Sequence, residues 1–242
     1  MRNLTARGIL ESWERGQQGG PVQRALAVLA GANPDWSVRE MAAMPVGRRD
    51  ALLLELRRRT FGSELRGRVV CPSCRQGLHV DIDLGGFEGT AADGRLHTCS
   101  AEGYDVRFRL PTSEDLDAAS RSGAVDEARA VLVRRCVSEI VADGEPRSTG
   151  DLPPSVVESI GARMEELDPL AEMPISLACA SCDHEWLVLL DIGEFLWAEV
   201  ARTAERVMYE VHKLADAFGW SEESILGMSS MRRQRYIDLL SR

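Results

Sequence analysis

The sequence predicts an α+β protein, mainly helical, in which a discontinuous four-cysteine ribbon carries a large inserted α-rich subdomain between helical N- and C-terminal arms. Three observations predict this class. Amphipathic patterns with helical spacing fill most of the chain. Two Cys-x-x-Cys elements, Cys71 to Cys74 and Cys179 to Cys182, each lead into a short apolar run. The 104 residues between them hold strand and helix patterns of their own, so the two halves of the ribbon enclose a separate folding region.

Composition and charge narrow the class of protein. The chain has 242 residues, of which 44% are hydrophobic and 28% charged, as in ordinary globular proteins. Its net charge of −9 disfavours general nucleic-acid binding, which needs clustered cations. No stretch approaches the roughly 18 apolar residues of a membrane span, and the N-terminus lacks the apolar core of a signal peptide. We therefore expect a cytoplasmic protein in a reducing compartment, where cysteine pairs bind metals more often than they form disulfides.

The N-terminal region, residues 1–66, is predicted to be helical. Residues 4–15 and 21–32 carry helical patterns on either side of a glycine-rich break. Ser37 opens a short helix with a capping-box pattern, and a longer helix follows from about Arg48 to Arg59. These helices form the first arm.

Two segments, residues 67–84 and 175–192, each have the pattern of a zinc knuckle followed by a strand. In both, a tight Cys-x-x-Cys turn presents two sulfurs, and an aspartate follows nine residues after the second cysteine (Asp83 and Asp191). Four thiolates complete a closed tetrahedral Zn²⁺ site with no position left for water or substrate. We therefore expect one structural zinc ion with four ligands: Cys71, Cys74, Cys179 and Cys182.

The sequence leaves alternatives to this joint site open. A local site could use Cys71 and Cys74 with His97 and Cys99, but it would leave the second cysteine pair without a metal. Metal-free thiols or a redox dithiol are further alternatives, and the redox one lacks a surrounding βαβ pattern. The long separation does not oppose the joint site, because an insertion whose ends meet adds little loop-closure cost. We expect His184 at the surface and Cys136 in the core.

The insert, residues 85–174, is predicted to begin with a loop over residues 85–102 and a strand over residues 104–110. The clearest amphipathic helix covers residues 124–142, where apolar side chains recur three and four positions apart. Shorter helices are expected on either side of it, one starting near Thr112 and one at the Pro153-Pro154 pair.

The C-terminal region, residues 193–242, is predicted to form the second arm. A long helix runs from about Glu194 to Phe218, with apolar residues along one face. Short helical pieces over residues 221–228 and 231–241 complete it.

An internal repeat relates residues 36–56 to residues 220–240 at an offset of 184 residues. Six of the 21 aligned positions are identical, where average residue usage gives roughly one or two. A shared unit of short helix, turn and arginine-led helix would also produce these identities. Trp and Arg are favoured at binding hot spots, although both tryptophans could instead pack on their own helices. The candidate partner-binding residues are Trp36, Arg48, Arg49, Trp220, Arg232 and Arg233.

We predict no catalytic residue and expect that the protein is not an enzyme. None of the four histidines stands beside a Ser or Cys in a nucleophile elbow, and no phosphate-cradling glycine loop follows a strand. The carboxylate pairs Glu165-Glu166 and Asp81/Asp83 are typical of solvated faces.

Four groups of stretches span nearly the whole chain: WERGQQGGPVQRALAVLAGANPDWS with GRRDALLLELRRRTFGSEL; CPSC with its strand; RFRLPTSEDLDAA, LVRRCV and DPLAEMPISLACASC; and DHEWLVLLDIGEFLWAEV with VHKLADAFGWSEESILGMSSMRRQRYIDLL. The most specific are the knuckle followed by LLDIGEFLW and the terminal GWSEESIL. Together these stretches resemble the baseplate-hub assembly proteins of contractile-tailed phages, in the form found in phage-tail-like contractile injection systems.

The resemblance implies a non-enzymatic, chaperone-like structural or assembly factor for the baseplate or hub of a contractile tail. It implies protein partners among hub or spike, wedge and tape-measure subunits. The expected location is the cytoplasm of the producing cell, with incorporation into the baseplate of the particle as a further expectation. The alternative function is a zinc-ribbon adaptor that binds nucleic acid or regulates transcription. It predicts a basic stripe near the knuckles, but Arg66, Arg68 and Arg75 are outnumbered there by acidic residues.

Overall fold

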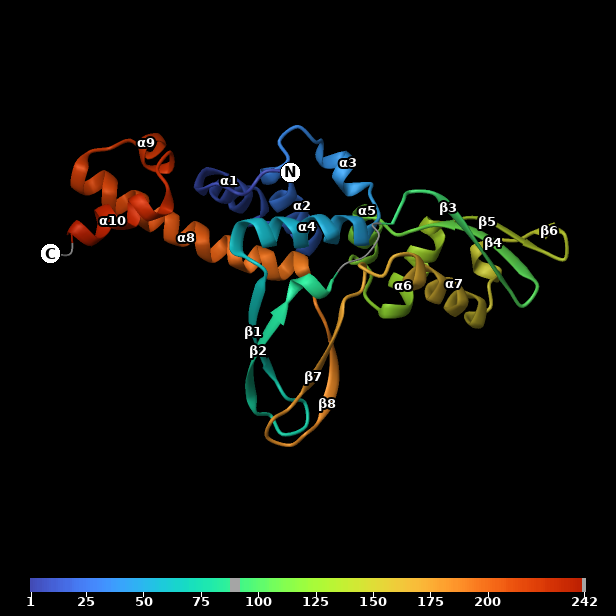
Figure 1. Cartoon of the computed structure of the whole chain (residues 1–242). Coiled ribbons are helices and arrows are strands. Elements are labelled where there is room, and N and C mark those ends of the chain that lie inside the picture. The colour runs from blue at the N-terminus through green and yellow to red at the C-terminus, as the bar shows by residue number, and fades with distance from the viewer. Residues whose placement is uncertain (88–91, 241–242) are drawn as a thin grey trace. The chain divides into compact units, whose positions relative to one another are not determined.

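The computed structural model describes residues 1–87 and 92–240, which form two compact units. The first unit joins residues 1–37 to residues 193–242, and the second comprises residues 38–192. Helices predominate, and the strands form three small antiparallel sheets (Figure 1). The α+β, mainly helical class is therefore confirmed. The finer division at residues 66, 84, 174 and 192 stays a prediction. No helix in the described part of the chain is both long and apolar enough to cross a membrane.

The first unit is helical throughout its described residues. Its helices are α1 (Ala6–Gly16), α2 (Pro21–Ala32), α8 (Ile192–Phe218), α9 (Glu222–Leu226) and α10 (Ser230–Leu240). The side chain of Thr5 caps α1 by accepting the Gly8 N–H, and Pro21 starts α2 where its missing N–H costs no bond. The end of α1 packs closely on α8, because a Cβ on Gly16 would lie 2.6 Å from the Trp197 ring.

The second unit begins with α3 (Val38–Ala42) and α4 (Val46–Phe61) and then forms two hairpins. Strands β1 (Glu64–Val70) and β2 (Gly77–Asp83) make the first hairpin, and β7 (Pro174–Ala178) and β8 (Glu185–Leu189) make the second. The hairpins run side by side, and their turns meet at one end (Figure 1). Only the second strand of each hairpin was expected. Each first strand is the antiparallel partner that satisfies the backbone groups of the second.

The insert between the hairpins contains more strand than its sequence predicts. Its sheet has the order β3-β4-β5-β6, with α5 (Ser113–Ala119), α6 (Val125–Cys136) and α7 (Pro154–Leu167). Its buried core comprises Val106, Phe108, Ile140, Val156 and Ile160. The strands are β3 (Leu96–Ala101), β4 (Tyr104–Arg109), β5 (Val137–Ala142) and β6 (Glu145–Pro146).

Two expectations for the insert were wrong. The helix predicted over residues 124–142 ends at Cys136, and the chain passes directly into β5, where Val137 has an extended conformation. The apolar spacing continues across this point because Ile140 belongs to the same core as part of a strand. The loop predicted over residues 85–102 contains β3, and residues 88–91 of it lie outside the described residues.

Two separate segments of the insert meet at the start of α4. Pro45 forms an isolated antiparallel bridge with Thr112, and the Val46 N–H donates to the Pro111 carbonyl over 3.0 Å. From near the C-terminal end of the insert, the Asp168 carboxylate accepts the Gly47 N–H at 2.9 Å and caps the helix. These contacts fasten the insert to the helix that precedes the first hairpin.

The internal repeat has the same local structure in both copies. Adding 184 to the bounds of α3 gives those of α9, and adding it to the first residue of α4 gives that of α10. The residues in the middle of the short helices, Met41 and Ile225, are fully buried. The arginines at the fourth position of the longer helices, Arg49 and Arg233, are also buried. The repeat is thus one helix–turn–helix unit that occurs twice.

Candidate metal centre

Four cysteines meet where the turns of the two hairpins come together. Cys71 and Cys74 lie in the β1–β2 turn, and Cys179 and Cys182 lie in the β7–β8 turn. All four sulfurs lie within 4.8 Å of one another, so this cluster could hold a metal ion. The structure brings together all four predicted metal ligands. Cys71 and Cys179 are buried, whereas Cys74 and Cys182 are exposed.

The two turns have the same backbone conformation. In the first, the Cys71 N–H donates to the Gln76 carbonyl and the Arg75 N–H donates to the Cys71 carbonyl. Cys179, His184 and Asp183 form the equivalent pair of bonds in the second. Arg75 and Asp183, each directly after the second cysteine, adopt left-handed conformations with φ of 62° and 55°. This conformation is unfavourable for a residue with a side chain. Its recurrence at equivalent positions indicates that both turns present their two sulfurs in the same way.

The distances between sulfurs fit a tetrahedral metal better than a disulfide. The Cys71 and Cys182 sulfurs lie 3.8 Å apart, and those of Cys74 and Cys179 lie 3.6 Å apart. Zinc–sulfur bonds of about 2.3 Å at tetrahedral angles place neighbouring sulfurs about 3.8 Å apart. A disulfide requires about 2.05 Å. The four-thiol donor set and its spacing therefore fit Zn²⁺.

The thiols perturb one another and receive backbone hydrogen bonds. The N–H groups of Ser181 and Cys182 point at the Cys179 sulfur and lower the pKa of that thiol to about 7. At Cys74, the Gln76 N–H acts to lower the thiol pKa, but the neighbouring thiols outweigh it and raise the pKa to about 12. Without a cation the cluster therefore keeps a thiol such as Cys74 protonated, and four thiolates could form here only around a bound metal ion.

The residues of the alternative local site lie elsewhere. His97 and Cys99 belong to β3, where Cys99 pairs with Val106 and packs against the core of the insert. Among the described residues, the four-cysteine cluster is the only group of potential metal ligands this close together. Cys136 is buried as expected, and its burial raises its thiol pKa to about 11. His184 is exposed and stacks on Trp186.

The predicted partner-binding residues separate into two kinds. Arg49 and Arg233 are buried and bind carboxylates of their own units, Asp50 and Glu210 respectively. The other four are exposed or half-buried: Trp36, Arg48, Trp220 and Arg232. The structure does not gather the six on one surface of either unit, and partner binding stays a prediction for them.

Sequence reasoning missed an ion-pair cluster that fixes the start of α5. The Asp115 carboxylate is fully buried and accepts hydrogen bonds from Arg109, Arg135 and Thr112. Burial alone would raise the pKa of Asp115, but these donors hold it far below its usual range. The helix start expected near Thr112 is confirmed, with a capping box between Thr112 and Asp115, but nothing in the local sequence reveals the two arginine partners.

Comparison with known proteins gives one match. The family model described as "T4 bacteriophage base plate protein" matches residues 31–197, which include both hairpins and the whole insert. No curated protein and no solved structure matches the chain.

Proposed function

The chain belongs to the T4 bacteriophage base plate protein family, and from this premise we propose that it is an assembly factor for the baseplate hub of a contractile, phage-tail-like particle. A structural role in a phage baseplate follows from the family itself. The chaperone-like role, the hub and the contractile injection system are the proposal's own additions, and they rest on the sequence resemblance.

The observation that supports this proposal most is the extent of the family match. It covers about two thirds of the chain and contains the four clustered cysteines together with the whole insert. Four sulfurs leave no coordination position open, which favours a structural metal over a catalytic one. The conformation shared by the two knuckle turns supports the same role. We propose that Zn²⁺ occupies it, held by Cys71, Cys74, Cys179 and Cys182.

In this proposal the metal fixes two hairpins from distant parts of the sequence, and the folded insert between them presents surfaces to other proteins. The expected partners are hub or spike, wedge and tape-measure subunits. The protein would act in the cytoplasm of the producing cell and could remain in the finished baseplate.

The charge of the hairpins supports protein partners over nucleic acid. Arg66 forms ion pairs with Glu64 and Asp81, so one of the three arginines near the knuckles is already neutralised. Steeply salt-dependent binding to random DNA would instead favour the nucleic-acid adaptor.

The test is a deletion of this gene in the producing strain, with electron microscopy of the particles and mass spectrometry of particles and free cytosolic protein. We expect the deletion strain to lack complete baseplates and the wild-type gene to restore them. Normal particles from the deletion strain would overturn the proposal. Detection of the chain in purified particles would assign it to the mature baseplate, and detection only in the cytosol would assign it to assembly.

A further inference from the structure

We propose that the groove between α6 and α7 of the insert binds an amphipathic helix of a partner protein, with an apolar stripe flanked by basic side chains. The inference rests on the proposed function only for the source of the helix, another protein of the same particle.

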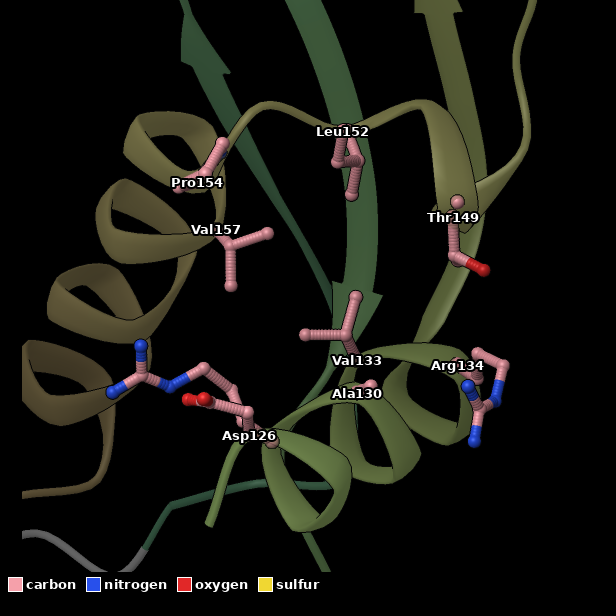
Figure 2. Close-up of a pocket in the computed structure, with 10 residues that line it drawn as sticks. Asp126, Ala130, Val133, Arg134, Thr149, Leu152, Pro154 and Val157 are labelled. Atoms are coloured by element: carbon pink, nitrogen blue, oxygen red, sulfur yellow. The ribbon is translucent and has the colours of Figure 1, made fainter. Parts of the chain in front are cut away.

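The groove is apolar at its centre and follows both helices. Two adjoining cavities, of about 280 and 400 Å³, share Arg129, Val133 and Val157 in their linings. Figure 2 shows Val133 of α6 and Val157 of α7 facing each other, with Leu152 converging on the same space. The second cavity adds Leu132, Ile160 and Met164.

Helix α6 leaves its apolar face only partly covered. Of its 12 residues only Cys136, the last, is buried, and Val125 is 78% exposed. A helix with this pattern normally buries a stripe against a neighbour. The apolar side chains along the groove are therefore half-buried within the described chain and leave room for a further element.

Gly161 indicates a close approach by that element. It lies in the middle of α7, where glycine costs about 1 kcal/mol relative to alanine. An added Cβ there would meet no atom within 4 Å, so the packing of the chain itself does not require glycine. Gly161 is exposed and lines the second cavity. A small residue at this place leaves room for the backbone of a bound helix.

The charges at the rim determine the chemistry of the partner. Glu158 and Glu165 lie on the α7 side of the groove, and neither forms an ion pair within the described residues. On the α6 side Asp126 extends towards α7 (Figure 2). The described lining thus carries three carboxylates against the two guanidinium groups of Arg129 and Arg134, both of which come from α6. A helix with Lys or Arg beside its apolar stripe complements this rim, in the manner of helix-in-groove recognition.

The test places a photo-cross-linking amino acid at Glu158 in the full chain in the producing strain, with the same substitution at Arg163 as control. Arg163 lies on α7 but does not line the groove. Mass spectrometry then identifies the cross-linked peptide. We expect position 158 alone to yield a segment of another particle protein with apolar residues at helical spacing and basic flanks. Equal yields at both positions, a segment of this same chain or an extended acidic segment would overturn the proposal.

A blocking variant supplies the second measurement. Gly161→Trp fills the groove, and the open space around Gly161 lets the chain fold, as circular dichroism and bound metal would show. We expect it to abolish the cross-link at position 158 and to weaken binding of the identified synthetic peptide at least about tenfold. Arg163→Trp should preserve both.

The outcomes separate this inference from the proposed function. If deletion of the gene blocks assembly but Gly161→Trp assembles particles and cross-links as wild type does, the groove proposal alone fails. If particles assemble without the chain, the assembly role fails, and a groove-specific cross-link to a basic amphipathic helix would still support the binding site.

Discussion

Arg49 and Arg233 occupy the same position in two copies of one helix–turn–helix unit, and the guanidinium of each lies buried against a carboxylate. In both copies the backbone N–H of the arginine donates to the carbonyl of the residue before the helix, Pro45 or Ser229, over 3.0 Å. The carboxylates come from different places: Asp50 is the next residue along the chain, whereas Glu210 belongs to α8. Arg233 thus fastens its copy to α8 through Glu210, and Arg49 fastens its copy to α5 by donating to the Ser113 hydroxyl at 3.2 Å.

Replacing Arg233 with methionine should destabilise the first unit by about 3 kcal/mol, because Glu210 is left buried without its main partner. Urea unfolding and hydrogen exchange of the α10 amides would measure the loss. Arg232→Met, at an exposed neighbouring position, should change stability by no more than about 0.5 kcal/mol. Adding Glu210→Leu to the Arg233 variant should recover part of the stability. No recovery would show that the pair is not coupled.

Changing Cys71 or Cys179 to serine should remove bound metal and cause a large loss of folded protein, because the free energy of structural zinc binding is also folding free energy. Elemental analysis should find about one zinc per wild-type chain and none in either variant. Cys99→Ser is the matched control, since Cys99 lies in β3 away from the cluster. Metal and melting temperature retained in both cluster variants would disprove the joint site.

Asp115→Asn should cost about 2 kcal/mol at pH 7, because a buried carboxylate loses charge-assisted hydrogen bonds from Arg109 and Arg135. The pKa of Asp115 is lower in the folded chain than the value of about 3.9 for an unfolded one. Its contribution is therefore complete above about pH 4 and is lost as the pH falls towards the folded value. The difference between wild type and variant, followed by chemical unfolding, should shrink in acid. Asp117→Asn, in a surface pair with Arg121, should show little effect at any pH.

The same substitution at two helical glycines should have opposite effects. Gly47→Ala places a Cβ 1.9 Å from the Asp168 carboxylate that caps α4, so it should destabilise the chain by about 1–3 kcal/mol. Gly161→Ala meets no atom within 4 Å and should stabilise it by about 1 kcal/mol through helix propensity. Thermal unfolding of the two variants side by side checks both signs. A stabilising Gly47→Ala would mean that the carboxylate does not approach this closely.

Much of the fold followed from local patterns in the sequence. The breaks, caps and prolines around α1, α2, α7 and α8 predicted these helices, because they act within one turn of the chain. The four clustered cysteines could also be picked out in advance, since Cys-x-x-Cys is a local signal that occurs twice. Whether the two Cys-x-x-Cys elements meet depends on tertiary contacts between the insert and α4, such as the hydrogen bond from the Gly47 N–H to Asp168.

The failures arose where tertiary contacts decide the structure. Residues 137–142 keep a spacing compatible with a helix, but pairing with β4 makes them a strand. Strands β1 and β7 gave little periodic signal by themselves and exist because β2 and β8 need partners. The α6–α7 groove could not be predicted from a motif, because it arises from the absence of packing on these two helices. The glycine at position 161, inside a helix, is the one local feature of the sequence that coincides with it.

The two hairpins have almost no interior apart from the cysteine cluster: within their described strands only Leu65 is buried. With zinc in place, the ion substitutes for a hydrophobic core in this part of the molecule. The stability of an ordinary hydrophobic core does not depend on the concentration of a ligand, but the stability of an element held by a bound ion depends on the concentration of the free ion. Each tenfold fall in free zinc would then destabilise the folded chain by about 1.4 kcal/mol. The supply of zinc in the producing cell would thereby set the fraction of chains whose two hairpins are held together.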